Sequence, residues 1–235
     1  MYRDTARYYD KIYSHKDYIA EVEKIYDLVG EKSLPKDASL LDVACGTGKH
    51  LLHFSDRFRV EGLDLCPELL NVARERLPGV ALHEADMTDF DLGRTFEVIT
   101  CLFSAIGHLE TNEQLDAAIS RMAAHIAPGG TLVVEPWLSP EEYTPNTVHS
   151  LLIEEPDLRI ARINTSLIEE GRWSVFALHH LIGTPTETKH IVEEHRLTLF
   201  TEEELRGAFE RADLAVTIDR EGLIGRGLYV GRAPK

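Results

Sequence analysis

The chain contains few cysteines and no long apolar run. Its 235 residues include three cysteines, Cys45, Cys66 and Cys101, which show neither a pairing pattern nor the spacing of a metal site. An odd number of cysteines without such a pattern is typical of a reducing compartment, and the polar N-terminus has no signal-peptide core. No apolar run approaches the ~20 residues of a membrane-spanning helix. We therefore expect a cytoplasmic protein with no membrane partner.

Basic residues are also scarce. The sequence has 25 lysines and arginines against 40 aspartates and glutamates, which gives a formal net charge of −15. A surface this acidic repels phosphate backbones, so nucleic acid is excluded as an expected partner. A small anionic substrate remains compatible with this charge if a few arginines are focused in one cleft.

A third glycine is missing from the most informative motif. An apolar run ends at Gly46-Thr47-Gly48 before a helix-like stretch, and glycines at such a turn let a ligand approach the backbone closely. A dinucleotide fingerprint has another glycine where this chain has Leu51. The next apolar run ends at Asp64, whose carboxylate can accept both hydroxyls of a ribose. The pattern indicates an adenosine cofactor without a pyrophosphate, which is S-adenosylmethionine.

Strand-like and helix-like segments alternate through the first part of the chain, as is typical of a parallel sheet with helices on both faces. Two amphipathic helices come first, at 5–14 and 17–31. The alternating strands are 40–45, 60–65, 80–85, 96–103 and 131–136, and the helices are 49–58, 67–77 and 112–126. We place the end of the last helix at Pro128-Gly129-Gly130. The α/β fold is completed by a helix at 202–212, capped by Thr201, and by strands near 215–221 and 226–232.

The pattern changes after Trp137. Residues 147–200 are rich in Val, Ile and Thr at alternating positions, with turn signals between the apolar runs. They predict four antiparallel strands, inserted between the two parts of a cofactor-binding domain, 1–146 and 201–235. An isolated strand meander is marginal and must pack on something. We expect the insertion to build an acceptor pocket and to provide a dimer contact.

Two acids and one histidine lie at or near strand ends, where ligands bind in open α/β sheets. Asp42 lies in an otherwise apolar strand, which favours a role in ordering the glycine turn or the amino-acid end of the cofactor over a strand-end position in water. Asp86 either accepts from an adenine amino group or only closes a turn. His108 follows the fourth strand and should reach the donor methyl, although many loop histidines have no role. The other cofactor contacts are expected from Ala44, Leu65, Met87 and Leu102.

Aromatic and basic residues are candidates for the acceptor side. Tyrosines crowd the N-terminus, where ordinary packing explains most of them and one or two can close over the cofactor as a lid. Trp137 is either a wall of the acceptor pocket or a core residue. Arg226 lies between Gly225 and Gly227, which suits a phosphate site and a surface turn equally. Arg196 is the second isolated arginine of this kind.

Histidines are concentrated in the inserted segment. Their spacing gives no recognisable zinc pattern, and adjacent residues of a strand point to opposite faces of the sheet. We therefore expect no metal site. These histidines are His179, His180, His190 and His195.

Together these residues resemble one branch of the class I S-adenosylmethionine-dependent methyltransferases. The most similar family comprises bacterial enzymes that N,N-dimethylate nucleotide-linked amino sugars, such as those of desosamine and mycaminose biosynthesis. The glycine motif identifies only the superfamily, whereas the later stretches fall in acceptor-binding regions and are more particular. The resemblance is carried by residues 41–48, 86–90, 92–94, 106–109, 134–137, 195–200 and 225–229.

The resemblance implies a Rossmann-like, mostly parallel seven-stranded sheet, and a TDP-linked deoxy amino sugar as the acceptor. It implies that Tyr2 and His108 flank the sugar amine and that Arg226 meets the diphosphate. It also implies that Tyr9 and Tyr18 line the cofactor, and that the enzyme is a homodimer that adds two methyl groups.

We expect in-line methyl transfer from a sulfonium to a neutral amine, with positioning supplying most of the rate. His108 either takes the amine's proton or only orients the amine while water takes the proton. Two alternatives stay open. One is an O- or N-methyltransferase for a non-nucleotide natural product, which titration with thymidine diphosphate would separate. The other is a non-catalytic module that binds the cofactor, which an absence of turnover on an amine panel would favour.

Overall fold

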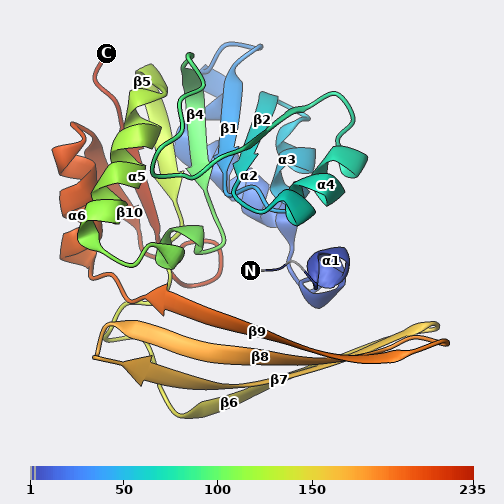
Figure 1. Ribbon diagram of the computed structural model, residues 1–235. Helices are drawn as coiled ribbons and strands as arrows, with labels where there is room; N and C mark the ends of the chain where they lie inside the picture. The colour runs from blue at the N-terminus through green and yellow to red at the C-terminus, as the bar shows by residue number, and fades with distance from the viewer. Residues whose placement is uncertain (1, 3) are drawn as a thin grey trace.

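The computed structural model describes residue 2 and residues 4–235. It consists of a seven-stranded sheet flanked by helices and a separate four-stranded sheet (Figure 1). The helices, with η for 3-10 helices, are η1 (Ala6–Tyr8), α1 (Tyr9–Ile12), α2 (Tyr18–Val29), η2 (Glu31–Ser33), α3 (Lys49–Phe54), α4 (Pro67–Arg76), η3 (Ala105–His108), α5 (Asn112–Ala124) and α6 (Glu202–Arg211). The strands are β1 (Ser39–Val43), β2 (Arg59–Asp64), β3 (Ala81–Glu84), β4 (Phe96–Cys101), β5 (Ile126–Val134), β6 (Thr147–Glu155), β7 (Leu158–Glu169), β8 (Trp173–Gly183), β9 (Thr188–Thr198), β10 (Ala215–Asp219) and β11 (Leu228–Arg232).

The large sheet has the order β10-β11-β5-β4-β1-β2-β3. Strands β1 to β5 pair in parallel, and only β11 pairs antiparallel to both of its neighbours. Successive strands are added on one side of β1, as β2 and β3, and then on its other side, as β4 and β5. The loops after β1 and β4 therefore diverge and leave a crevice. The predicted fold class is confirmed, and the crevice is where a ligand is expected.

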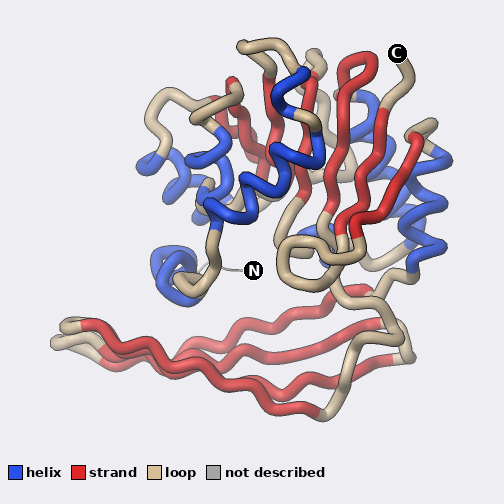
Figure 2. Tube along the Cα trace, turned by 180° about the vertical axis from the view of Figure 1, so that it is seen from behind, coloured by secondary structure: helices blue, strands red, loops and turns tan. Residues whose placement is uncertain are grey.

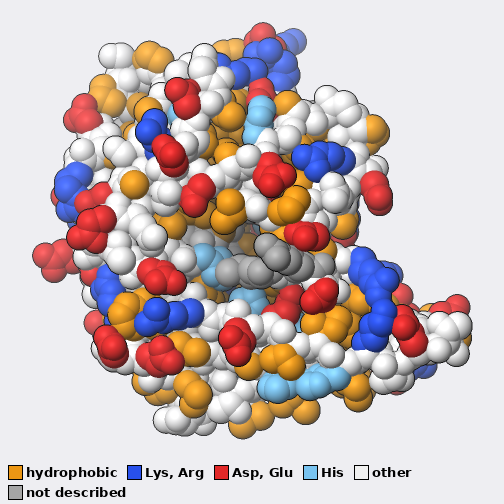
Figure 3. All heavy atoms as spheres, in the orientation of Figure 1, with side chains coloured by type: hydrophobic (Ala, Val, Ile, Leu, Met, Phe, Trp, Pro, Cys, Tyr) orange, Lys and Arg blue, Asp and Glu red, His pale blue; other side chains and the backbone are white. Residues whose placement is uncertain are grey.

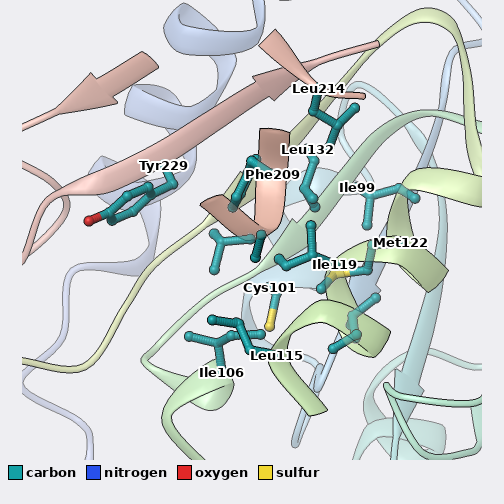
Figure 4. Close-up of a cluster of buried hydrophobic side chains, with 14 of the residues drawn as sticks. Ile99, Cys101, Ile106, Leu115, Ile119, Met122, Leu132, Phe209, Leu214 and Tyr229 are labelled. Atoms are coloured by element: carbon teal, nitrogen blue, oxygen red, sulfur yellow. The ribbon is translucent and has the colours of Figure 1, made fainter. Parts of the chain in front are cut away.

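Apolar side chains of the central strands point alternately into two cores, one on each face of the sheet. Leu41 and Ile99 pack with residues of α5 and α6, whereas Leu40 and Val98 pack with residues of α2, α3 and α4. Figure 4 shows Ile99 among the side chains of the first core. Helices therefore cover both faces. Burial on both sides explains why these strands are continuous apolar runs rather than alternating ones.

Most predicted boundaries agree with the structure, but the predicted start of β5 at residue 131 was wrong. The strand begins at Ile126 and continues through Pro128-Gly129-Gly130, with a shift in its register with β4 between Phe96 and Val98. A Cβ on Gly130 would lie 2.8 Å from the Glu97 carbonyl oxygen, so only glycine fits this irregular pairing. The cap of α6 is confirmed, because Thr201 and Glu204 form a reciprocal capping box.

The four predicted antiparallel strands form a sheet of order β6-β7-β8-β9. This sheet lies below the carboxyl ends of β1 and β4, and α1 lies between the two layers (Figure 1, Figure 2). One face of the small sheet looks towards the main body. The other face is open and carries exposed apolar side chains of β6, β7, β8 and β9.

Candidate functional site

A cavity of about 1460 Å³ lies between the crevice and the small sheet. The molecule is hollowed there, and histidine side chains are visible inside (Figure 3). Its walls come from the N-terminal helices, the ends of β1, β2 and β4, the inner face of β6 to β9, and the loop before β11. Pockets for a single small molecule measure roughly 300–1,000 Å³, so this cavity has room for two reactants.

The glycine turn and Asp64 form one side of the cavity. Ala44 and Gly46 line it with positive φ angles of 59° and 56°. Asp64 accepts hydrogen bonds from the Gly46 N–H through Oδ2, at 2.7 Å, and from the Cys66 N–H through Oδ1, at 2.8 Å. Burial raises the pKa of Asp64, and these N–H groups oppose the shift. The carboxylate has about four lone-pair sites, so it can hold the turn and still accept ribose hydroxyls.

Gly48 has a packing role rather than a place on the cavity wall. A Cβ at this position would lie 2.9 Å from Leu77 Cδ1 and 3.3 Å from Ala73 Cβ. Its φ of 73° also belongs to the left-handed region that favours glycine. Gly48 therefore lets the turn approach α4 closely, which differs from the cofactor contact expected for it.

The other predicted cofactor residues also divide into those that line the cavity and those that do not. Leu65, Asp86, Met87 and Leu102 line the cavity, and Asp86 Oδ1 also accepts the Thr88 N–H at 2.8 Å. Asp86 thus closes a turn and also lines the cavity, so its position is compatible with both of its alternative roles. Residue Tyr18 does not line the cavity, because its ring packs edge-on against His50 at 4.9 Å.

Asp42 is buried behind the turn and does not line the cavity. Its Oδ1 accepts a hydrogen bond of 2.7 Å from Thr100 Oγ1 on β4, not from the glycine turn. Burial raises its pKa to about 6. Its charged form is therefore disfavoured in the folded chain, so Asp42 lowers stability as the pH rises from about 4 to about 6.

Several tyrosines of the N-terminal segment face the cavity. Tyr2 and Tyr9 line it with their ring centroids 5.2 Å apart. Tyr13 also lines it, 5.0 Å edge-on from the Phe103 ring, although the sequence analysis gave Tyr13 no separate role. Its spacing of four residues from Tyr9 places both on one helical face, a signal that was available in the sequence.

A buried polar triad near the glycine turn was missed. The Lys16 side chain is 3% exposed, and its Nζ lies 2.7 Å from Glu21 Oε1. His50 Nε2 lies 2.7 Å from the other carboxylate oxygen of Glu21. Burial alone would raise the pKa of Glu21, but hydrogen bonds from His50 and Lys16 lower it. Lys16 and Glu21 line the cavity, so charged groups of opposite sign meet there.

His108 is at the end of η3 and lines the cavity. Its Nδ1 is buried without a hydrogen-bond partner among the described residues. Burial, followed by the neighbouring His195, lowers the pKa of His108 to about 4. The imidazole is therefore neutral at physiological pH.

Arg226 faces the cavity from the loop before β11. Its guanidinium lies 4.3 Å from the centroid of the Trp137 ring, and Nη1 donates to Ser104 Oγ at 2.6 Å. No ion pair within 4.0 Å in the described part of the chain involves Arg226, although the buried Glu135 carboxylate is near enough to act on its charge. Burial lowers the pKa of Arg226, Glu135 opposes the shift, and the residue stays a cation. A partly buried guanidinium that makes no direct ion pair suits an anionic ligand.

The loop after β4, whose Ser104 accepts the hydrogen bond from Arg226, is fixed by Glu135, to which the sequence analysis assigned no individual role. Phe103 and Ser104 both have positive φ, and Glu135 Oε2 accepts the Phe103 N–H at 2.6 Å. Ser104 Oγ in turn donates to the Pro136 carbonyl at 2.7 Å. Glu135 is fully buried, so it stabilises an unusual backbone conformation directly beside the cavity.

Arg196 is not brought into the cavity. It lies on β9 between His195 and Leu197, which do line the cavity, so strand alternation directs it to the opposite face. Its guanidinium stacks over Trp173 at 3.9 Å and pairs with Glu110 and Glu169. The expected contact with an acceptor is therefore corrected to a role in surface packing.

The histidines of the small sheet also alternate between its faces. His195 lines the cavity and His180 is buried, whereas His179 and His190 are exposed. Among residue 2 and residues 4–235, no group of three or more His, Cys, Asp or Glu side chains is arranged to hold a metal ion. No helix in that part of the chain is long and apolar enough to cross a membrane.

Comparison with known proteins gives consistent matches. Residues 40–130 match a family described as a methyltransferase domain. The dTDP-3-amino-3,6-dideoxy-alpha-D-glucopyranose N,N-dimethyltransferase of Streptomyces fradiae is 45% identical, over 97% of this chain and 90% of that protein. The dTDP-3-amino-3,4,6-trideoxy-alpha-D-glucopyranose N,N-dimethyltransferase of Streptomyces venezuelae is 41% identical, over 97% of each.

Solved structures agree with these sequence matches. The crystal structure of Streptomyces venezuelae DesVI has a TM-score of 0.90 at 41% identity, covering 97% of both chains. The SAM-bound structure of CalS10, an amino pentose methyltransferase from Micromonospora echinaspora, has a TM-score of 0.85 at 40% identity, covering 95% of both. The likeness includes the small sheet as well as the large one, because it extends over nearly the whole chain.

Proposed function

This chain belongs to the family of S-adenosylmethionine-dependent N,N-dimethyltransferases that includes these relatives, and we propose that it methylates the amino nitrogen of a dTDP-linked deoxy amino sugar twice. The observation that carries the proposal is the shared cavity. Asp64 lies at one part of it, neutral His108 at another, and Arg226, a cation that makes no direct ion pair with any described residue, at a third. A donor nucleoside, an amine and a diphosphate each have a matching group.

The residues near the glycine turn fit the donor. Asp64 suits the ribose, Asp86 and Met87 suit the adenine, and Leu65 provides an exposed apolar side chain beside them. The Lys16–Glu21 pair suits the amino-acid end, because a zwitterion matches a cation and an anion held 2.7 Å apart. When bound, S-adenosylmethionine supplies an electrophilic methyl group on a sulfonium.

The acceptor end uses the inserted segment. We assign 1–146 and 201–235 to donor binding, and we assign the inner face of 147–200, with Trp137 and Arg226, to the acceptor. Arg226 binds the diphosphate while the ring of Trp137 supports the guanidinium. Tyr2 and His108 flank the amine, and Tyr13 joins them from the same wall.

The amine attacks the methyl group as a neutral nucleophile, so its ammonium form must lose a proton before the transfer. A histidine with a pKa of about 4 is a weak base towards an ammonium, and we therefore assign His108 to orienting the amine while water takes the proton. The assay that tests the function is mass spectrometry on a panel of nucleotide-linked amino sugars. We expect the gain of two methyl groups. Methylation of free amino alcohols, with no response to thymidine diphosphate, would favour a non-nucleotide acceptor.

The pH dependence separates an orienting His108 from a proton-accepting one. Because its lowered pKa keeps the imidazole neutral, no inflection is expected near its ordinary value of 6.5. Instead, kcat/KM should rise with pH until the acceptor's own ammonium loses its proton, near about pH 8 for an α-amino type of amine. Initial rates between about pH 5 and about pH 9 give this profile.

The variant His108→Asn keeps a hydrogen-bonding side chain but cannot accept a proton. For an orienting role, kcat should fall only about tenfold, the effect of one hydrogen bond, and the profile should keep its shape. A fall of about 100-fold, with loss of an inflection near pH 6.5, would show instead that His108 is the base.

We further propose that the protein is cytoplasmic and forms a homodimer through the open face of the small sheet. Val148 and Leu152 on this face are 70% and 63% exposed, and Ile163, Leu181 and Val192 add to the same patch. Soluble monomers rarely expose such continuous apolar surfaces. Analytical ultracentrifugation should give twice the chain mass of 26.5 kDa.

A double variant, Leu152→Lys with Leu181→Lys, should sediment as a monomer, because it places charges in the contact. Ile19→Lys is the matched control, since Ile19 is 61% exposed on α2, away from this face. A wild-type chain that sediments as a monomer at high concentration would exclude the dimer.

A further inference from the structure

Two imidazoles face the same part of the cavity from different elements. His108 comes from η3 and His195 from β9, and their ring centroids are 6.1 Å apart. Both line the cavity. Each has a buried ring nitrogen, Nδ1 of His108 and Nε2 of His195, without a hydrogen-bond partner among the described residues. Such orphaned buried atoms are rare in native proteins and point to a missing partner.

The surroundings of His195 are aromatic. Its ring stacks on Phe176 at 5.2 Å and 11°, and the Tyr2 ring lies 5.2 Å away on another side. His195 is 2% exposed, and burial lowers its pKa to about 4, although Glu193 opposes the shift. A neutral imidazole has one nitrogen that accepts a hydrogen bond. His195 therefore offers a neutral acceptor atom to a wall of the cavity that also holds Arg162 and Asn164.

We propose that His195 is a second residue that orients the acceptor, holding one N–H of a primary amine while His108 holds the other. This inference rests on the proposed function. A primary amine has two N–H groups and one lone pair. When two imidazoles accept the N–H groups, the lone pair is left to point at the donor methyl, which in-line transfer requires.

The two methyl transfers then use His195 differently. In the first, the nitrogen lone pair forms the N–C bond as the S–C bond breaks and the sulfur keeps the electron pair. The resulting ammonium loses one proton to water and leaves a secondary amine with a single N–H. The new methyl replaces the other N–H and lies beside His195, where the rings of Phe176 and Tyr2 also pack. The second transfer therefore needs only His108.

The experiment compares the two steps with separate acceptors, the dTDP-linked 3-amino-3,6-dideoxy sugar and its N-monomethyl derivative, in single-turnover reactions. His195→Phe keeps an aromatic ring against Phe176 and removes the acceptor nitrogen. We expect it to slow the first transfer about tenfold and the second by less than about twofold. His195→Gln restores a polar acceptor and should recover most of the first rate. His190→Gln, on the exposed face of the same strand, is the control and should change neither rate.

Equal slowing of both transfers by His195→Phe, or no change in either, would overturn the inference. Binding of S-adenosylhomocysteine by calorimetry shows that each variant is folded, and His195→Leu, which also lacks the acceptor nitrogen, gives the readout if His195→Phe is not folded. Failure of the proposed function is recognised separately, because the wild-type protein would then methylate neither acceptor.

Discussion

Asp64→Ala should weaken S-adenosylmethionine binding by roughly 2–4 kcal/mol, or about 30- to 1,000-fold in Kd. The variant lacks the carboxylate that we propose to accept charge-assisted hydrogen bonds from the ribose hydroxyls. It also removes the Asp64 oxygens that accept the Gly46 and Cys66 N–H groups at 2.7 and 2.8 Å, so the glycine turn is no longer held in place for the ligand. Isothermal titration calorimetry with the donor and its demethylated product measures the loss directly.

Two further variants make this result specific. Asp64→Asn keeps the size of the side chain and one acceptor oxygen, so its loss should be smaller than that of the alanine variant. Glu84→Gln is the matched control, because Glu84 pairs with Asp64 across β2 and β3 but is exposed and does not line the cavity. Donor binding that is unaffected in Asp64→Ala, or any binding of nicotinamide dinucleotides by the wild type, would contradict the assignment of this site.

Arg226→Ala should chiefly raise the KM of the acceptor, by an amount equivalent to about 2–3 kcal/mol, while kcat changes little. The guanidinium meets the diphosphate in the ground state and the transition state alike, so its removal weakens both equally. The effect should be large because Arg226 is mostly shielded from water and makes no direct ion pair with an acid in the part of the chain that the structure describes. Steady-state kinetics with a saturating donor gives both constants.

Competition with thymidine diphosphate provides an independent readout, since its affinity should fall by the same factor. Arg226→Lys should recover part of the affinity, because a lysine keeps the charge but not the planar contact with Trp137. Arg220→Ala is the control, because Arg220 lies on the same loop, is exposed and pairs with Glu202. An unchanged KM in Arg226→Ala would argue against a nucleotide-linked acceptor bound in this way.

Local patterns predicted the fold because each strand and helix has its own hydrophobic periodicity and its own turn or capping residues. The run before Gly46, the acid at Asp64 and the capping Thr201 are readable from neighbouring residues alone. The start of β5 was misjudged because a Pro-Gly-Gly sequence normally ends an element, and only the close approach of β4 allows the strand to include it.

The site was less predictable, because it depends on contacts between distant segments. Glu21 and His50 are 29 positions apart and meet only when α2 packs on α3, so no spacing rule identifies the pair. Arg196 was misplaced because a strand's inner face is unknown until it packs. His195 received no role of its own beyond a rejected metal site and membership of the stretch 195–200, since its position beside His108 requires the small sheet to fold under the large one.

The separation of the cavity walls has a consequence for how such enzymes diversify. The proposed donor contacts come from the turns of the large sheet, whose central strand β1 is buried on both faces. Much of the proposed acceptor wall comes from alternate residues of the small sheet, such as Asn164 and Leu178, which lie outside the two large cores. Substitutions at these inward positions change the shape offered to a sugar without disturbing the hydrophobic contacts that fold the domain. A lineage can thus acquire new acceptors by altering one face of four strands while it keeps the same methyl donor.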